Sequence, residues 1–159
     1  MASLTVSIST RELTQRLRER LEPGKSGTVI WQDGGDRVLL FAGRLRARSV
    51  DGWLLCDLDV QTDQTDRQTL QFVFYLGQRG DGDGPRAAAT INAPTLAQAQ
   101  LADRWGADIQ RVLWDGVLDA VEVAVANFGD AAEEAVLLTG FHVDAEDLHV
   151  DVLVGDSHA

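Results

Sequence analysis

The stretch WLLCDLDVQTDQTDRQTLQFVFYLGQ, residues 53–78, decides the fold class, because it contains two strand patterns separated by a polar interval. In residues 53–60 alternate apolar side chains share one face, as on a half-buried strand. They are Leu54, Cys56, Leu58 and Val60. Cys56 is therefore interpreted as a small core residue rather than a nucleophile. Residues 61–68 are polar and predict a loop. Residues 69–78 contain FVFYL, apolar on both faces, which predicts a central strand covered on both sides.

On the N-terminal side of this stretch, two further strand patterns and a helix are predicted. Residues 28–32 and 37–49 flank Asp-Gly-Gly-Asp, whose glycines suit a tight turn, so they predict a hairpin. Residues 3–8 alternate as in a short strand. A helix over 10–22 follows, because a serine precedes a glutamate by three residues and leucines recur every four residues.

On the C-terminal side, the pattern is mixed. Residues 86–92 predict a strand, and Thr95 after a proline is suited to cap a helix over 95–104. Residues 107–128 fit a helix in their first half. In their second half β-branched residues alternate at Val121, Val123 and Val125, which favours a strand.

The tail of the chain predicts a second hairpin, from residues 136–143 and 148–154. In that register one face is apolar, while His142 and His149 lie opposite each other on the polar face, with Cβ atoms about 5 Å apart. Two imidazoles so close are able to hold zinc or another transition metal. The alternative is that they are ordinary surface histidines.

Together these patterns predict a β-rich α+β fold, a two-layer β-sandwich-like core of seven to nine strands with helices near 10–22 and 95–104. The 159 residues suit a single domain, 1–159. The four tryptophans are scattered among different elements, so core packing is expected for them. They are Trp31, Trp53, Trp105 and Trp114.

The net charge of −11 is unevenly distributed. Residues 1–48 hold nine Lys/Arg and five Asp/Glu, whereas residues 49–159 hold five and twenty. Such acidity repels phosphate backbones and anionic lipid, so neither nucleic acid nor a membrane is expected as a partner. A single cysteine and the lack of a secretory signal favour the cytoplasm.

Basic residues gather near the predicted N-terminal helix. They include Arg11, Arg16, Arg18 and Arg20. The simpler interpretation is a solvated helix face, and the alternative is a basic docking face for an acidic partner.

Asp57 and Asp59 share a strand face, and paired carboxylates suit calcium. The Asp-Gly loop at 79–85 offers further oxygens, although acidic turns are commonly only solvated. Motifs for nucleophilic catalysis, a P-loop or a dinucleotide site are absent from the sequence.

The chain resembles the TerD-type tellurite-resistance and stress-protein family in an ordered series of short motifs. These are the Asp-Leu-Asp at 57–59, the Phe-Val-Phe-Tyr at 72–75, the DIQRVL at 108–113, the Asn-Phe-Gly at 127–129 and the closing hairpin. The resemblance implies a calcium-binding β-sandwich of the stress response, with calcium on Asp57 and Asp59 only. The loop at 79–85 is shorter than in the family, and the helix over 10–22 is foreign to it.

Three functions follow from these patterns. The first is a small intracellular, non-enzymatic binding or regulatory module of stress-response type, with calcium as the suggested cofactor. The second is an acidic adaptor or chaperone for a basic protein partner. The third is a metal-dependent enzyme that uses His142 and His149. Oligomeric state is not given by the sequence.

Overall fold

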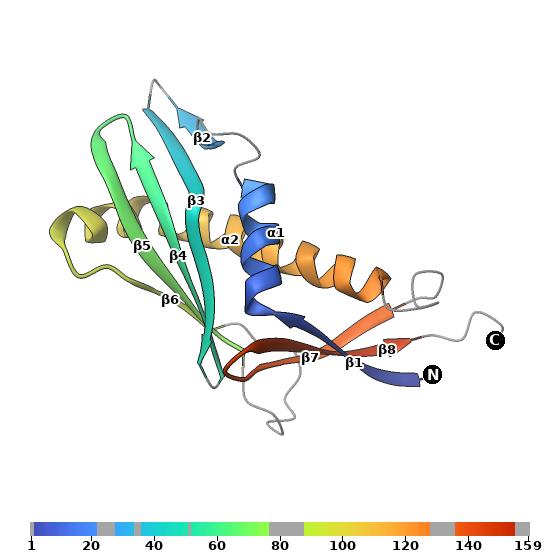
Figure 1. Cartoon of the computed structure of the whole chain (residues 1–159). Coiled ribbons are helices and arrows are strands. Elements are labelled where there is room, and N and C mark those ends of the chain that lie inside the picture. Colours follow the sequence, from blue (N-terminus) through green and yellow to red (C-terminus); the bar gives the residue numbers. More distant parts are fainter. Residues whose placement is uncertain are drawn as a thin grey trace.

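The computed structural model describes residues 2–21, 28–33, 36–50, 52–76, 88–127 and 136–154. Over these ranges the chain forms eight strands and two helices, and Figure 1 shows their arrangement. The strands form a five-stranded antiparallel sheet, ordered β2-β3-β4-β5-β6 and curled into a half-barrel, and a three-stranded antiparallel sheet, ordered β1-β8-β7. The predicted β-rich α+β class with two sheets is confirmed. In chain order the elements are β1 (Ala2–Ser9), α1 (Thr10–Leu21), β2 (Thr28–Asp33), β3 (Asp36–Val50), β4 (Trp53–Thr62), β5 (Thr65–Tyr75), β6 (Ala88–Asn92), α2 (Leu96–Ala126), β7 (Val136–Val143) and β8 (Asp147–Val154).

The larger sheet is a meander in which each strand pairs with the next along the chain. The predicted hairpin of β2 and β3 is confirmed. The loop predicted over residues 61–68 is wrong, because β4 continues to Thr62 and β5 begins at Thr65. Those polar residues extend the hairpin with backbone pairing, and the hydroxyls of Thr62 and Thr65 lie 2.8 Å apart across its turn.

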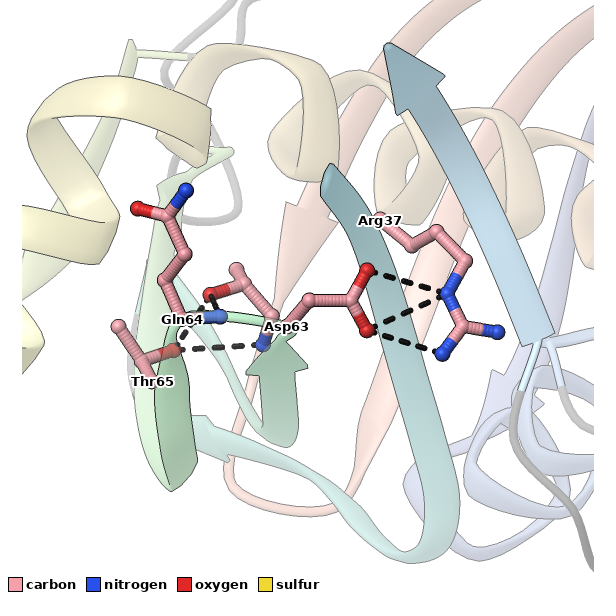
Figure 2. A network of polar contacts seen from close by, with 5 residues as sticks. Arg37, Asp63, Gln64 and Thr65 are labelled. Atoms are coloured by element: carbon pink, nitrogen blue, oxygen red, sulfur yellow. Dashed lines mark hydrogen bonds and ion pairs between the residues drawn. The ribbon is translucent and has the colours of Figure 1, made fainter. Parts of the chain in front are cut away.

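An ion pair fastens the start of β3 to this turn, as Figure 2 shows. The Arg37 guanidinium donates to both oxygens of Asp63, and its shortest hydrogen bond is 2.9 Å long. These hydrogen bonds lower the pKa of Asp63 and raise the pKa of Arg37. The pair therefore links the first described residues of β3 to the far end of the β4–β5 hairpin.

The inner face of the larger sheet carries the predicted apolar row of β4, and all four of its side chains are buried. Burial raises the pKa of the Cys56 thiol to about 12, which suits a core residue and keeps the thiol protonated. The expectation that residues 69–78 are covered on both sides is wrong for β5. Phe72 and Phe74 are buried, but Val73 and Tyr75 are only partly so, because no described helix covers the outer face.

Helix α2 covers this inner face, and it is far longer than predicted. The sequence patterns predict a helix over 95–104 and a strand near 121–125, yet α2 runs without interruption from Leu96 to Ala126. The alternating valines mislead because Val117, Val121 and Val125 also recur every four residues, so they continue the buried stripe of Ile109 and Leu113. The predicted N-cap at Thr95 is confirmed: its hydroxyl accepts from the Gln98 amide, and the Gln98 side chain accepts from the Thr95 amide in return, which makes a capping box.

Helix α2 reaches both sheets, passing behind the larger sheet and α1 to the smaller one (Figure 1). The Trp114 ring contacts Phe74 of β5 in a tilted arrangement and Phe141 of β7 edge to face, with ring centroids 5.6 and 5.8 Å away. Trp105 is buried, and Trp114 is partly buried against the core, so core packing is confirmed for both tryptophans. It is wrong for Trp53, which is 40% exposed on the outer face of the larger sheet, and the Trp31 side chain lies outside the description.

The smaller sheet joins the first and last described strands. The tail hairpin is confirmed, and its apolar face is buried as expected. The pairing of β1 with β8 was not predicted. The Gly52 amide donates to the Val143 carbonyl at 3.1 Å and ties the β3–β4 turn to the end of β7. The φ of Gly52 is 83°, in the region that favours glycine.

Helix α1 closes one edge of β3 (Figure 1). Its predicted leucine stripe is buried, and the Ser9 hydroxyl caps it by accepting from the Glu12 amide at 3.1 Å. Past the part of β3 that pairs with β2, side chains of α1 form hydrogen bonds with the backbone groups at the edge of β3. Thr14 Oγ1 bonds both backbone groups of Ala47, and Arg18 Nε donates to the Leu45 carbonyl at 2.7 Å. No helix of the described ranges has both the length and the apolar character needed to cross a bilayer.

We expect Gly116→Val to destabilise the fold, because a Cβ at Gly116 would lie 2.8 Å from Leu17 Cδ2, which is fully buried. Overpacking of this kind costs about 1–3 kcal/mol of unfolding free energy, more than valine gains over glycine in helix propensity. Urea unfolding followed by circular dichroism measures the change. Gly43→Val is the matched control, because nothing lies within 4 Å of a Cβ there. Equal stabilities of the two variants would contradict the close approach of α1 and α2.

We also expect Asp63→Asn to change how stability depends on pH. The hydrogen bonds from Arg37 hold the folded-state pKa of Asp63 below its ordinary value, so the ion pair stabilises the fold above that ordinary pKa. Its contribution is lost as pH falls through the folded pKa. Wild type should therefore exceed Asp63→Asn in stability near about pH 7, and the difference should shrink toward about pH 3. Asp103→Asn, on exposed α2 surface, is the control; a difference independent of pH would refute the assignment.

Candidate functional site

A groove of about 680 Å³ lies between the first half of α1 and the edge of β3. Four of its lining residues are arginines, two from each element. They are Arg11, Arg18, Arg46 and Arg48. Thr10, Gln15 and Ser49 add hydroxyl and amide groups, and Ala145 of the β7–β8 turn closes one end. The described lining contains no Asp or Glu side chain, so the groove is strongly basic within a chain of net charge −11.

The charges of these arginines are only partly compensated. Arg48 contacts Asp57 at 3.4 Å, and Arg18 donates to a neutral backbone carbonyl. Arg11 and Arg46 are exposed and form no ion pair with the described residues. Guanidinium groups bind carboxylates and phosphates through paired N–H donors. The groove therefore presents donors and positive charge to an anionic ligand.

Two buried atoms beside the groove lack hydrogen-bond partners within the described structure. They are Arg48 Nε and Ser49 Oγ. An unsatisfied buried polar atom costs about 1–3 kcal/mol, so native proteins usually satisfy such atoms with protein, water or ligand. Both residues line the groove, so its ligand is a candidate partner for these atoms.

The groove borders an exposed apolar surface on the outer face of the larger sheet. Arg46, Arg48 and Val50 occupy alternate positions of β3 and therefore share a face. Val50 is 58% exposed, and Trp53 packs on Tyr75 with ring centroids 4.8 Å apart. A shallow hollow of about 460 Å³ lies here, lined by Val50, Trp53, Leu55, Val73, Thr90, Ile91 and Asn92.

The predicted calcium residues, Asp57 and Asp59, lie on this outer face and already have polar partners. Asp57 accepts from Gln71 at 3.1 Å and contacts Arg48. Asp59, 4% exposed, accepts from the Thr69 hydroxyl at 2.6 Å and lies 3.9 Å from Arg44 Nε. Calcium takes six to eight oxygen ligands, and its ligation here stays a prediction. The Asp-Gly loop at 79–85 lies outside the described residues.

The predicted cross-strand position of the two histidines is confirmed, whereas metal binding by this pair stays a prediction. His142 and His149 are cross-strand neighbours whose rings stack, with centroids 4.7 Å apart and planes 24° from parallel. Both rings lie on the outer face of the smaller sheet. The sequence patterns did not reveal a third strand beside them: β1 places Ser7 opposite His149, with Ser7 Oγ 2.6 Å from Nδ1.

The other ring nitrogen of His149 contacts the β7–β8 turn. His149 Nε2 lies 2.7 Å from Asp144 Oδ2, while Asp144 Oδ1 accepts from the Glu146 and Asp147 amides. Together these bonds hold the pKa of Asp144 well below its ordinary value, the largest effect coming from His149. Ser7, His149 and Asp144 form a hydrogen-bonded chain like that of serine hydrolases. Ser7 is exposed and lines neither of the two hollows described above.

Comparison with protein-family models, curated proteins and solved structures finds no match to this chain. The resemblance to TerD-type proteins therefore stays a prediction.

The buried carboxylate of Asp59 supplies a test of the outer-face network. We expect Thr69→Val to lower the unfolding free energy by about 1–3 kcal/mol, because it removes a donor to a buried charged oxygen. Thermal and urea unfolding measure the loss. Thr90→Val, at an exposed position of β6, makes the same chemical change without a carboxylate partner in the described structure. Equal stabilities for the two variants would show that the Thr69 hydrogen bond contributes nothing.

Proposed function

We propose that this chain is a non-enzymatic binding module whose arginine groove holds an acidic segment of a partner protein. The observation that carries the proposal is the convergence of four arginines, with no carboxylate in the described lining. The proposal keeps the binding-module hypothesis drawn from the sequence. The partner segment at this groove is expected to be acidic. This agrees with the alternative interpretation of the N-terminal arginines, a basic docking face for an acidic partner.

The acidity of the whole chain decides which anion suits the groove. A nucleic acid extends well beyond one groove and would meet the repulsion of a net charge of −11. A short peptide segment experiences mainly the local field, because the Debye length at physiological ionic strength is about 8 Å. Carboxylate side chains on such a segment match the paired donors of guanidinium groups.

The neighbouring apolar surface adds a second requirement for the partner. Val50 continues the row of Arg46 and Arg48 and pairs with Trp53 across β3 and β4, so a segment that follows this row from the arginines meets Trp53. Burying a partly exposed tryptophan and valine stabilises a complex, and aromatic residues and arginine commonly dominate binding energy. We therefore expect the partner segment to combine acidic and large apolar residues.

The hypothesis of an acidic adaptor for a basic partner concerns a different surface of the chain. Exposed carboxylates occur along the solvent side of α2, at Asp103, Asp108, Asp115 and Glu122. Arg111 lies among them, so the acidity of this face is interrupted. We place the arginine groove first because its charges converge on one concavity.

A fluorescein-labelled peptide of alternating glutamate and leucine tests the proposal by fluorescence anisotropy. Wild type should bind it with an affinity that falls as salt is raised. The double charge reversal Arg11→Glu with Arg46→Glu should weaken binding by at least about tenfold, since it replaces two attractive pairs by repulsive ones.

Arg111→Glu is the control, because it reverses the charge of one exposed arginine of α2 outside the groove. Circular dichroism confirms that each variant folds. Equal affinity of the double reversal and the control would exclude the groove as the binding site. Failure of the wild type to bind, with a poly-lysine peptide bound instead, would favour the basic-partner hypothesis.

A further inference from the structure

We propose that Asp144, Asp147 and His149 form a zinc-binding site on the outer face of the β1-β8-β7 sheet; none of the three lines the arginine groove, although Ala145 of the same turn closes one end of it. Each residue offers one ligand atom, and these atoms lie within 4.8 Å of one another. Within the described ranges no other group of three or more His, Cys, Asp or Glu side chains brings its ligand atoms so close together. Zinc accepts imidazole nitrogen and carboxylate oxygen together, whereas calcium and magnesium prefer oxygen alone.

The spacing of the ligand atoms is close to what a tetrahedral ion requires. Zinc holds nitrogen and oxygen ligands about 2.0–2.2 Å away, so two of its ligand atoms lie about 3.4 Å apart. His149 Nε2 and Asp144 Oδ2 are 2.7 Å apart and share a hydrogen. For the ion to replace that hydrogen, the distance between Nε2 and Oδ2 has to increase from 2.7 Å to about 3.4 Å. The third ligand atom, on Asp147 at the start of β8, lies within 4.8 Å of the other two, so zinc binding requires that this side chain move closer to them.

The surroundings already orient the ligands. Ser7 Oγ lies 2.6 Å from Nδ1 of His149, and acceptance of an Nδ1 hydrogen by this hydroxyl leaves Nε2 as the metal-binding nitrogen. Asp144 Oδ1 accepts two backbone amides of the turn, which directs Oδ2 toward the imidazole. Partners of this kind fix the tautomer and direction of metal ligands and are usual at zinc sites.

His142 has a different place from the one expected in the sequence interpretation. Its ring stacks on His149, and its Nδ1 lies 3.9 Å from Asp151 on the side away from the turn. It does not belong to the group of three ligand atoms. We therefore assign His142 a packing role beside the site. Three protein ligands leave the fourth zinc position to water, as in zinc sites that are not fully closed.

Zinc titration of the full chain, after chelator treatment and its removal, tests the site by isothermal titration calorimetry. Cobalt substitution gives a second readout, since tetrahedral cobalt absorbs visible light strongly. We expect one zinc per chain and a rise in melting temperature on zinc addition. His149→Gln should weaken binding at least about a hundredfold, and Ser7→Ala about tenfold through the lost orientation of the imidazole.

His142→Gln and Asp103→Asn are the controls, and both should bind zinc as the wild type does. Circular dichroism without metal shows that each variant folds. Equal zinc binding by His149→Gln and wild type would overturn the site. An equal loss in His142→Gln and His149→Gln would overturn the assigned ligand set. Absence of zinc binding by the wild type up to about millimolar concentration would overturn the proposal as a whole.

Discussion

The structure depends on one constraint: the apolar inner face of a curled sheet has to be covered, and two helices share in covering it. Helix α1 packs on β3, while α2, with 31 residues, packs on β5 and β6 and continues past α1 to β1 of the smaller sheet. Trp114 then packs against both sheets, through Phe74 on one side and Phe141 on the other. A glycine at position 116 lets α1 approach α2 closely at Leu17. The apolar side chains buried in this way supply most of the driving force for folding.

The same arrangement decides where polar chemistry can be placed. Because β2 pairs only with the first part of β3, the remaining edge of β3 is left for α1 to cover. Thr14 and Arg18 satisfy backbone groups that would otherwise invite edge-to-edge association. The strip between helix and strand edge becomes a groove, and it is basic because both elements come from the one part of the chain that is rich in arginine. On the smaller sheet, β1 completes the surroundings of His149 by adding Ser7.

Much of the local structure follows from short-range patterns. The leucine stripe of α1, the capping boxes, the hairpin of β2 with β3 and the tail hairpin depend on side-chain period and turn residues a few positions apart. So does the cross-strand contact of His142 with His149. The patterns fail where two periods coincide. Val121 and Val125 fit both a strand and a helix, and the helix is selected because it buries them in one stripe with Val117 and Leu113. Polar residues near Thr62 suggested a loop, yet backbone pairing keeps them in strands.

By itself, then, the sequence determined the β-rich class, the buried state of Cys56, the basic and acidic regions and the close approach of two histidines. Only the tertiary structure decided that Arg11 and Arg18 face Arg46 and Arg48 across one groove. It alone brought Ser7 and His149 together, 142 positions apart in the chain. The physical reason is the distance along the chain over which each kind of interaction acts. Periodicity and turn chemistry act over a few residues, whereas the pairing of β1 with β8 and the docking of α1 on β3 arise when distant apolar faces are buried together.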